Sequence, residues 1–537
     1  MLFLAAGLLP LGSSIRMSFC NDIWYDELFT MGLIQHSYGS LTAFTAQDVH
    51  PPLYYYIVKL SVYLCKLIMP EINAVIVAKI VSVLPYFLLL FYTIFFLRKR
   101  FGLFPAGLFF FCILAMPQMS AYTVEIRMYS WALFFVTAAY FHAYELMRKQ
   151  KGKSWYLHGV LFVCYGLAAA YTQYFACIAV IMLYLCLLLW FIYRYMYNKK
   201  KNNTTKPLIR TDSETGGVWR ICAWFIGAAI SVIGYLPWLF VLYRQMSMIK
   251  ENYWILPLTW RSLGGCVKYI FLPGNMAGWP GVVVAAAFAG LYGIFFLYLC
   301  FKACREQNML CIYAILGVFV LAGLVLFGFA ASFLFRPIFI YRYMTPALGC
   351  FWFTFALGLD VFIGEDVFQT DLITQILEVR SPVFRVIGAV ACIFVFLTGL
   401  KDYRSFLGEE KYKASLMEET VAALDGIGED DILIFNFDQI QMVTGYYINN
   451  DSYLWYGEPE KLIQEICSEK ESLNEDMNQI REWLLAGEKV WFLGSFNSRE
   501  DILALWRQEG IVSKEQGSYL LERYWFNLYE LSLDMKQ

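Results

Sequence analysis

The sequence predicts an α-helical polytopic membrane protein with a small α/β domain at its C-terminal end. Of the 537 residues, 59% are hydrophobic and only 16% are charged, whereas apolar residues make up about 45–50% of a soluble domain. The apolar residues gather in long runs up to residue 400, and the remainder has the mixed composition of a soluble domain. Most of the chain is therefore expected to lie in lipid.

Charge and histidine spacing argue against two kinds of partner. The formal net charge is −1, whereas a nucleic-acid partner requires a basic surface. The four histidines are widely spaced, so no HxxxH or CxxC…CxxC metal-ligand pattern occurs. Nearly all fourteen cysteines fall in apolar runs, where cysteine behaves as a small buried hydrophobe. No metal site and no disulfide framework are predicted from spacing.

The first two apolar runs set the topology. Residues 1–15 are predicted to form the first membrane helix, because they lack the basic start and the small-residue cleavage site of a signal peptide. The run 52–69 is interrupted by Lys59 and Lys66. It is predicted to lie flat on the membrane surface as an interfacial helix.

With that assignment, every strongly basic connection falls on the cytoplasmic side, as the positive-inside rule requires. These connections are 98–100, 147–154, 198–218 and 302–305. About eleven membrane helices result, at 1–15, 74–97, 101–117, 129–147, 155–175, 176–197, 219–243, 279–301, 309–330, 338–362 and 384–400.

The expected domains follow from this topology. Residues 1–400 form the membrane domain, in which 19–73 make the first extracytoplasmic loop and carry the catalytic residues. Residues 401–537 form a soluble extracytoplasmic α/β domain, because strand patterns alternate with helical ones. No glycine-rich phosphate fingerprint occurs there, so the tail is assigned no catalytic role. Strands are expected at 431–437, 452–456, 488–494 and 518–531, and helices at 411–425, 459–467, 475–486 and 498–508.

An adjacent acidic pair follows the first apolar run, in the segment IWYDELFT. Such a pair is usually part of a solvated loop, but here apolar residues on both sides would hold Asp26 and Glu27 against the bilayer. Asp48 and His50 follow before two prolines that stiffen the chain. A carboxylate in a partly dry site can take a proton from an attacking hydroxyl. Asp26 and Glu27 are therefore the candidate catalytic residues, and Asp48 and His50 are candidate pocket residues.

Two further motifs carry cations, VEIRMY and YRYMTP. A lone Glu-x-Arg is usually a surface pair of little energetic weight, and an arginine at a helix end commonly anchors that end at the interface. Both motifs, however, precede apolar runs at the same predicted face, and a guanidinium fork suits a phosphate. Arg127 and Arg342 are candidate phosphate ligands, and Glu125, Tyr129 and Tyr343 are candidate pocket residues.

Three more features belong to the predicted outer face. Lys79 lies in an apolar run, where an ionisable residue is a functional candidate, and its expected partner is a phosphate or a carboxylate. Gln173, in AYTQYFA, is a candidate pocket residue. Tyr253, Trp254 and Trp260 are interpreted as interface-belt aromatics, although their rings could also stack on a sugar.

Carboxylates, a histidine and several cations thus gather around apolar walls. Such a set suits a reaction in which a lipid-anchored phosphate leaves and a hydroxyl attacks. Cations stabilise the leaving phosphate where its charge develops, and a carboxylate serves as the base. The same carboxylates could hold a divalent metal, so metal dependence stays open, and no other cofactor is predicted.

Together these motifs resemble the GT-C superfamily of integral-membrane glycosyltransferases. Within it, they are most similar to the bacterial family 39 branch, which is related to protein O-mannosyltransferases and to aminoarabinose transferases that modify lipid A. The motifs fall in the family's order between residues 20 and 350. They are IWYDELFT, DVHPPLYYY, AYTVEIRMYSW, AYTQYFA and IYRYMTPAL.

The resemblance implies an enzyme that takes a sugar from a polyprenyl-phosphate donor. It would pass the sugar, with inversion, to an envelope glycan, lipid or protein on the outer face of the cytoplasmic membrane. Asp26 matches the family's general base, and Arg127 and Arg342 match positions that face the lipid phosphate. Glu125 would orient the arginines. The sugar, the acceptor and the oligomeric state do not follow from the motifs.

The chain departs from the family pattern at two positions. Lys79 stands where many relatives have arginine, which keeps the charge but loses the bidentate fork. Gln173 stands where histidine is expected, so a hydrogen-bonding role persists and a titrating role does not. The tail is not the trefoil repeat of eukaryotic protein mannosyltransferases.

Two other classes of function are open alternatives. In a transporter or flippase of a lipid-linked or anionic substrate, Lys79 and the outer arginines would line a path, but transporters tend to place charges near the bilayer midplane. In a membrane scaffold or sensor, the tail would be a binding module. Loss of turnover on replacing Asp26 would separate an enzyme from a scaffold.

Overall fold

The computed structural model describes residues 1–20, 22–204, 218–248, 255–274, 276, 278–364, 381–448, 453–455, 466 and 477–534. The chain divides into two compact units. The first, called here the helical unit, comprises Met1–Phe19, Asp48–Ile57 and Ala78–Phe406. The second, the mixed unit, comprises Cys20–Gln47, Val58–Val77 and Leu407–Gln537. This division differs from the expected boundary at residue 401, because most of the first loop groups with the tail.

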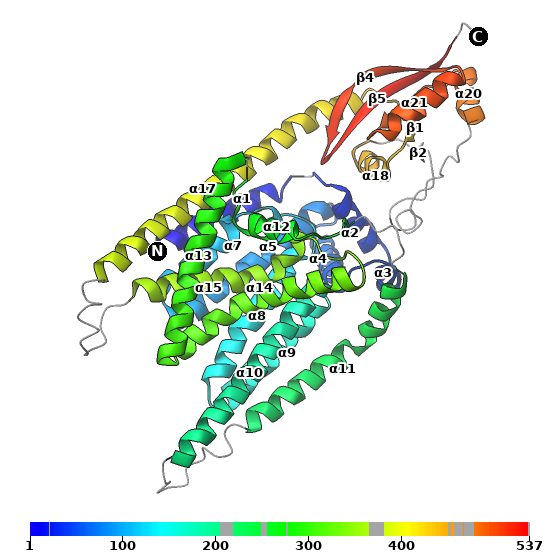
Figure 1. Cartoon of the computed structure of the whole chain (residues 1–537). Coiled ribbons are helices and arrows are strands. Elements are labelled where there is room, and N and C mark those ends of the chain that lie inside the picture. The colour runs from blue at the N-terminus through cyan, green and yellow to red at the C-terminus, as the bar shows by residue number, and fades with distance from the viewer. Residues whose placement is uncertain are drawn as a thin grey trace. The chain divides into compact units, whose positions relative to one another are not determined.

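Every predicted apolar run coincides with a helix (Figure 1). The helices up to the tail are α1 (Leu2–Met17), α2 (Tyr25–Gln35), α3 (Tyr38–Gln47), α4 (Leu53–Ile68), α5 (Ala74–Tyr92), a π-helical turn (Thr93–Leu97), α6 (Arg98–Phe101), α7 (Leu103–Ala115), α8 (Tyr129–Arg148), α9 (Lys153–Ala170), α10 (Tyr174–Thr204), α11 (Val218–Met248), α12 (Arg261–Phe271), α13 (Gly278–Glu306), α14 (Met309–Leu334), α15 (Thr345–Ile363) and α17 (Ser381–Leu424). Short 3-10 turns precede α8 and α15, at Ala121–Thr123 and Tyr341–Met344.

Within the described residues, seven helices are long and apolar enough to cross a membrane. They lie in Ala74–Phe101, Tyr174–Lys199, Val218–Met246, Gly278–Glu306, Met309–Leu334, Tyr341–Ile363 and Val383–Leu424. Helices α1 and α7 are apolar but shorter. The chain is a multi-pass, mostly helical membrane protein, as predicted. The surface position of α4, which is not among the seven, stays a prediction.

The core of the helical unit is built on α7, α8 and α15, whose residues are almost all buried and mostly apolar. A helix enclosed by others is expected to be apolar on all sides, and α8 departs from this at His142 and Glu145. Phe109, Phe110 and Phe111 of α7 are fully buried. Small residues allow close approach of such helices, and a Cβ on Gly349 of α15 would lie 1.9 Å from Oγ1 of Thr137 in α8. These helices therefore form a rigid frame for the segments that connect them.

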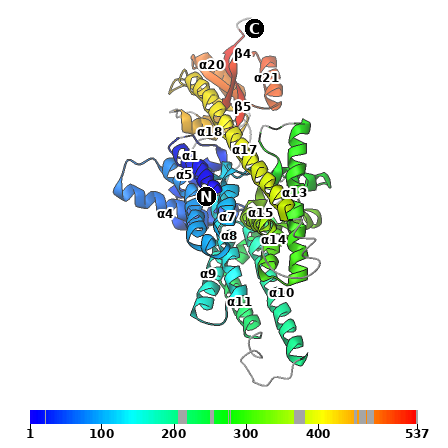
Figure 2. The ribbon, with the colours of Figure 1, turned by 90° about the vertical axis from the view of Figure 1, so that its left-hand side faces the viewer.

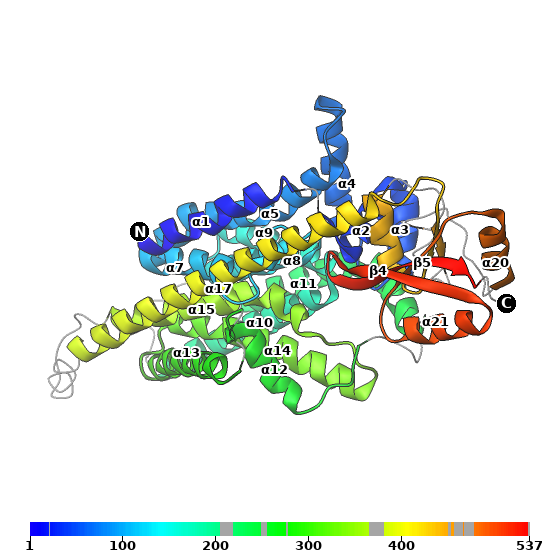
Figure 3. The same cartoon turned by 90° about the horizontal axis from the view of Figure 1, so that it is seen from above.

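The helices outside this frame are exposed on one face. Figure 2 shows α9, α10 and α11 running side by side, and Figure 3 shows α1 beside α7 and α13 beside α15. In α11 only 6% of the apolar window is buried. An apolar helix that exposes most of its surface is expected to face lipid.

The mixed unit contains a five-stranded sheet in the order β2-β1-β3-β5-β4. The strands are β1 (Ile432–Phe435), β2 (Tyr453–Trp455), β3 (Val490–Gly494), β4 (Ile511–Leu521) and β5 (Tyr524–Leu533). The first three are parallel, and β5 is antiparallel to both β3 and β4. Helices α18 (Asp438–Tyr447), α20 (Met477–Ala486) and α21 (Ser498–Gln508) connect or flank them. Parallel strands need such crossovers.

Of the elements predicted for the tail, one strand is wrong and one helix falls almost entirely outside the described residues. The single strand expected at 518–531 is wrong, because β4 and β5 form a hairpin that turns at Glu522 and Arg523. Glu522 has a positive φ of 55°, which a tight turn requires. The helix expected at 459–467 falls almost entirely outside the described residues.

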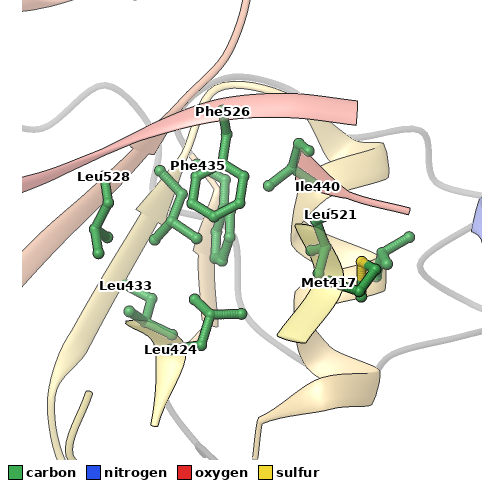
Figure 4. Close-up of a cluster of buried hydrophobic side chains, with 10 residues drawn as sticks. Met417, Leu424, Leu433, Phe435, Ile440, Leu521, Phe526 and Leu528 are labelled. Carbon is green, nitrogen blue, oxygen red and sulfur yellow. The ribbon is translucent and has the colours of Figure 1, made fainter. Parts of the chain in front are cut away.

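One face of the sheet packs on the end of α17. Met417 and Leu424 of α17 contact a buried cluster with Leu433, Phe435, Ile440, Val443, Leu493, Leu521, Phe526 and Leu528. Figure 4 shows these side chains gathered between α17, β1 and the β4–β5 hairpin. Tyr25 and Leu28 of α2 pack against the same cluster, so this core includes a segment of the first loop.

Candidate functional site

In the helical unit, the polar residues predicted from sequence come together at the starts of several helices. Asp48 and His50 lie just before α4, and Oδ2 of Asp48 is 3.0 Å from Nδ1 of His50. The side-chain amide of Gln245 donates to the Asp48 carbonyl oxygen. The Leu53 N–H donates to the carbonyl oxygen of Tyr171, 3.0 Å away. These contacts fix the turn that two prolines already stiffen.

The charge of Asp48 is favoured by its surroundings. Burial opposes ionisation of the carboxyl group, but the attraction and hydrogen bond of His50, together with the charge of Arg127, outweigh it. The pKa of Asp48 therefore lies below its ordinary value of 3.8. An opposite charge within a few ångströms has this effect. Asp48 is thus an anion that lies within electrostatic reach of Arg127.

Glu125, Arg127 and Tyr129 precede or begin α8 and are all buried, with exposed fractions of 8%, 5% and 1%. The guanidinium carbon of Arg342 lies 5.7 Å from the centroid of the Tyr129 ring. The charges of Arg127 and Arg342 both act on the Tyr129 hydroxyl group. The structure therefore brings the two predicted phosphate ligands to the same tyrosine, and we call Arg127, Tyr129 and Arg342 the cation cluster.

Tyr343 and Gln173 join the same region from two other connections. The Tyr343 ring stacks on Phe175, with ring centroids 4.8 Å apart, which ties the start of α15 to the start of α10. Gln173 lies two residues before Phe175 and is 2% exposed. Neither its amide nitrogen nor its amide oxygen has a hydrogen-bond partner in the described part of the chain. A buried amide normally has partners, so Gln173 is suited to meet a polar ligand.

Three helices begin at this cluster, α8, α10 and α15. The contacts that join their starts are Arg342 with Tyr129 and Tyr343 with Phe175. The N-terminus of a helix carries a partial positive charge and N–H groups that its own turns leave without partners. Together with the guanidinium groups of the buried Arg127 and the half-buried Arg342, these helix starts make a site suited to an anion.

Lys79 is buried in α5, with an exposed fraction of 4%. It lies one turn from Ser82, whose hydroxyl is 3.3 Å from that of Tyr54. The Trp131 indole N–H donates to the Val81 carbonyl oxygen over 3.0 Å, so this part of α5 is fastened to the first turn of α8. Lys79 therefore belongs to a part of α5 that is joined to the start of α8, and its role toward a phosphate stays a prediction.

Asp26 and Glu27 belong to the mixed unit, in the first turn of α2. A joint site of these carboxylates with the cation cluster stays a prediction. Glu27 is buried, and its carboxylate accepts a hydrogen bond of 3.1 Å from the Trp24 N–H. Glu27 therefore caps the start of its own helix, and Asp26 is only half-buried.

Sequence reasoning missed a group of tyrosines around the cluster. Tyr122 contacts the Tyr129 ring, with centroids 5.1 Å apart. Its hydroxyl is hydrogen-bonded to that of Tyr269, which is 3.3 Å from Oγ1 of Thr345. Tyr122 stands in the AYTVEIR motif, a signal that could have been used. Tyr269 stands in an outer loop that was expected to have no helix, so it had no such signal.

A groove of about 810 Å³ lies beside these tyrosines. Its lining includes Tyr269 and Tyr341, the cations Arg261 and Lys268, and the indole of Trp260, which is 80% exposed. No carboxylate is among its nine lining residues. Most of the lining comes from α12, within the predicted outer loop 244–278. Such a surface suits an anionic molecule that also offers a sugar face for stacking.

Two further expectations concern metals and aromatics. Among the described residues, no group of three or more His, Cys, Asp or Glu side chains could hold a metal ion. Tyr253 and Trp254, predicted as interface aromatics, lie outside the described residues. Trp260 is described and lines the groove.

Comparisons with known proteins give structural matches only. No protein-family model matches the sequence, and no curated protein sequence matches it. The structure is similar to ArnT from Cupriavidus metallidurans bound to undecaprenyl phosphate, with a TM-score of 0.54 and 12% identity over 99% of this chain and 98% of that chain. The apo state of the same protein matches with a TM-score of 0.52 and 12% identity over 99% and 97%.

A more distant match is the archaeal oligosaccharyltransferase AglB from Archaeoglobus fulgidus, in complex with an inhibitory peptide and a dolichol-phosphate. Its TM-score is 0.43, with 9% identity over 92% of this chain and 69% of that one. The ArnT matches extend over nearly the full length of both proteins, so they concern the whole architecture. The chain shares the fold of ArnT, a mostly helical membrane fold with a small C-terminal sheet, as predicted from the sequence.

Proposed function

We propose that this chain is a membrane glycosyltransferase that uses a polyprenyl-phosphate sugar as its donor. The observation that carries the proposal is the cation cluster, in which the buried Arg127 and the half-buried Arg342 lie just before α8 and α15. It lies in a fold shared with a protein that binds undecaprenyl phosphate. A polyprenyl-phosphate ester brings one phosphate to a membrane surface, and a buried anion site in a membrane protein suits it.

In the proposed reaction the acceptor hydroxyl oxygen bonds to the anomeric carbon. The bond from that carbon to the phosphate oxygen breaks, and its electron pair leaves with the phosphate. Arg127 and Arg342, with Lys79, stabilise the charge that develops on the phosphate. Attack from the opposite side inverts the anomeric carbon. The acceptor proton passes to Asp26, the proposed general base.

The remaining pocket residues would orient these groups. Asp48 and His50 form a hydrogen-bonded pair within electrostatic reach of Arg127, so they would hold its guanidinium group in place. Gln173 offers a buried amide to a polar substrate atom. Glu27 caps α2, so of the two neighbouring carboxylates Asp26 is assigned the chemical role.

We assign the groove at α12 to the acceptor. Its two cations favour an acceptor with phosphate or carboxylate groups, and Trp260 would stack on a sugar ring. The reaction is placed on the outer face of the cytoplasmic membrane, because the positive-inside rule orients the basic connections toward the cytoplasm. An envelope glycan or glycolipid meets these requirements.

The test is sugar transfer in proteoliposomes. The purified chain is supplied with labelled polyprenyl-phosphate sugars and an envelope extract, and wild type is compared with Arg127→Gln and Asp26→Asn. A matched control is Arg305→Gln, which removes an exposed arginine at the end of α13. Transfer of label by wild type and the control, with at least a tenfold loss in both other variants, is the expected result.

Other outcomes point elsewhere. Transfer that survives in Asp26→Asn would move the base to another carboxylate, and transfer that survives in Arg127→Gln would remove the phosphate role from the cation cluster. If no donor supports transfer but the labelled lipid crosses the bilayer, the chain is a lipid transporter. The buried cations would then line its path.

A further inference from the structure

The residues around Asp26 are held by the C-terminal part of the chain. All contacts that show this lie within the mixed unit, which joins Cys20–Gln47 to Leu407–Gln537. They involve the end of α17, helix α18 and the turn of the β4–β5 hairpin. The expected organisation treated the tail as a separate domain with no part in catalysis, and these contacts change that view.

A lysine on α17 forms the centre of the first set of contacts. Nζ of Lys413 lies 2.9 Å from Oδ2 of Asp22, 3.2 Å from Oε2 of Glu410 and 3.4 Å from Oε2 of Glu522. The side chain of Glu522 is 2% exposed. Burial raises the pKa of Glu522, and the charge of Lys413 opposes that shift. Lys413 therefore lies between Asp22 and the buried Glu522, and the charge of Asp22 also raises the pKa of Glu522, so removal of Lys413 would increase the repulsion between the two carboxylates.

The next two residues of the loop are held by the same turn and by α18. The Ile23 N–H donates to the hydroxyl of Tyr447 at 3.2 Å, and that hydroxyl donates to Glu522. The guanidinium carbon of Arg523 lies 3.7 Å from the ring centroid of Trp24. A cation this close to a buried indole is a strong cation–π contact.

The first turn of α2 is fixed in turn. The Tyr25 hydroxyl donates to Oδ2 of Asp438 at 3.4 Å, and Tyr25 and Leu28 pack on the buried core of the sheet. Positions three apart share one face of a helix, and the next position is rotated by about 100°. With Tyr25 and Leu28 held against the core, the direction of the Asp26 side chain is set.

We propose that the C-terminal α/β segment positions Asp26, and that Lys413 is the positioning residue through which it does so. The inference rests on the proposed function, in which Asp26 is the general base. A base must lie within hydrogen-bond reach of its proton, and a displacement of about 1 Å can cost about 10²-fold in rate. Repulsion between Asp22 and Glu522, once Lys413 is removed, would shift the segment that leads into α2.

The experiment compares Lys413→Met with Lys413→Arg and Lys411→Met in the full-length protein. Lys411 is an exposed lysine on the same helix, so its replacement is the matched control. We expect kcat for sugar transfer to fall at least tenfold in Lys413→Met, with KM for the donor within twofold. Lys413→Arg should recover at least half of the wild-type kcat, because the charge is restored. Lys411→Met should behave as wild type.

A readout that needs no turnover accompanies these rates. Hydrogen exchange of the amides of residues 22–28 should be at least tenfold faster in Lys413→Met than in Lys411→Met, because the loop loses its anchor. If Lys413→Met fails to fold, Tyr447→Phe takes its place, since it removes only the hydroxyl that meets Ile23 and Glu522. We expect a threefold or larger loss of kcat in that variant.

The outcomes separate this inference from the proposed function. If Lys413→Met or Tyr447→Phe has wild-type kcat and wild-type hydrogen exchange, the inference is wrong. If Asp26→Asn is inactive in the same preparations, the proposed function is still supported. Full activity in Asp26→Asn overturns both the base assignment and the inference. A wild-type chain that transfers no sugar removes the function, and the exchange result then decides whether Lys413 anchors α2.

Discussion

Replacing Arg342 by lysine and by methionine should separate the charge of this residue from its planar fork of donors. The guanidinium carbon lies 5.7 Å from the Tyr129 ring centroid, in the turn that begins α15. Lysine keeps the charge but cannot donate two parallel hydrogen bonds to one phosphate. Methionine keeps an unbranched stem and removes both. Arg342→Lys is therefore expected to lose one charge-assisted contact with the phosphate, and Arg342→Met is expected to lose all of them.

The expected losses follow from the energies of such contacts. A hydrogen bond to a charged group contributes about 1.5–3 kcal/mol, and about 1.4 kcal/mol corresponds to a factor of ten. Arg342→Lys should therefore weaken binding of the lipid phosphate about tenfold. Arg342→Met should weaken it about 100-fold, because the second contact and the cationic charge are lost as well.

The assay is binding of undecaprenyl phosphate to the protein in nanodiscs, followed by kcat and KM with a sugar-loaded donor. A contact that holds the phosphate equally before and during the reaction raises KM when it is lost, whereas one that forms as the phosphate leaves lowers kcat. Arg305→Met, at the exposed end of α13, is the control. Binding and turnover of Arg342→Met within twofold of wild type would refute the assignment of a phosphate to this cluster.

Three further predictions concern single side chains. His50→Gln removes the charge that lowers the pKa of Asp48. Ionised Asp48 contributes stability above pH 3.8, and this contribution is lost as the pH falls through the lower pKa of the folded state. In the variant the contribution should be smaller by about 1 kcal/mol, which thermal unfolding from pH 2 to 7 measures. Lys268→Glu should raise KM for an anionic acceptor about tenfold at low salt and less at high salt, while an uncharged acceptor shows no change. Glu27→Gln, whose amide oxygen can still cap α2, should keep kcat within threefold of wild type, whereas a loss as large as that of Asp26→Asn would make Glu27 a chemical participant.

The helices of this chain could be predicted because lipid imposes a simple rule on them. A membrane helix needs about twenty apolar residues, and each predicted run coincides with a helix. The strands of the tail could be predicted less completely. Strand β4 contains Lys514, Glu515, Gln516 and Gly517, so its apolar pattern is weak, and it lies at the edge of the sheet, where one side needs no burial. Its hairpin with β5 was therefore read as one strand.

The candidate site could be predicted in part. The motifs around Arg127, Arg342 and Asp48 each precede an apolar run, and the topology put them on one face, so their meeting in the helical unit was expected. The contacts of Lys413 with Asp22 and Glu522 were not predicted. They join residues more than a hundred positions apart along the chain, and no local pattern marks which charged residue on a surface helix will be used for such a contact.

The suitability of the cation cluster for an anion depends on the backbone as well as on side chains. Arg127 comes two residues before α8, Gln173 one residue before α10 and Arg342 three residues before α15. Residues at such places are positioned by helices whose own packing is mostly apolar, and α8 and α15 are almost completely buried. Apolar packing tolerates many substitutions of similar volume, so the helices can keep their arrangement at 12% identity to ArnT. The charge of the site therefore depends on two things. One is a few residues in short connections, and the other is the partial positive charge of the helix starts, which comes from the backbone and does not depend on the side chains there.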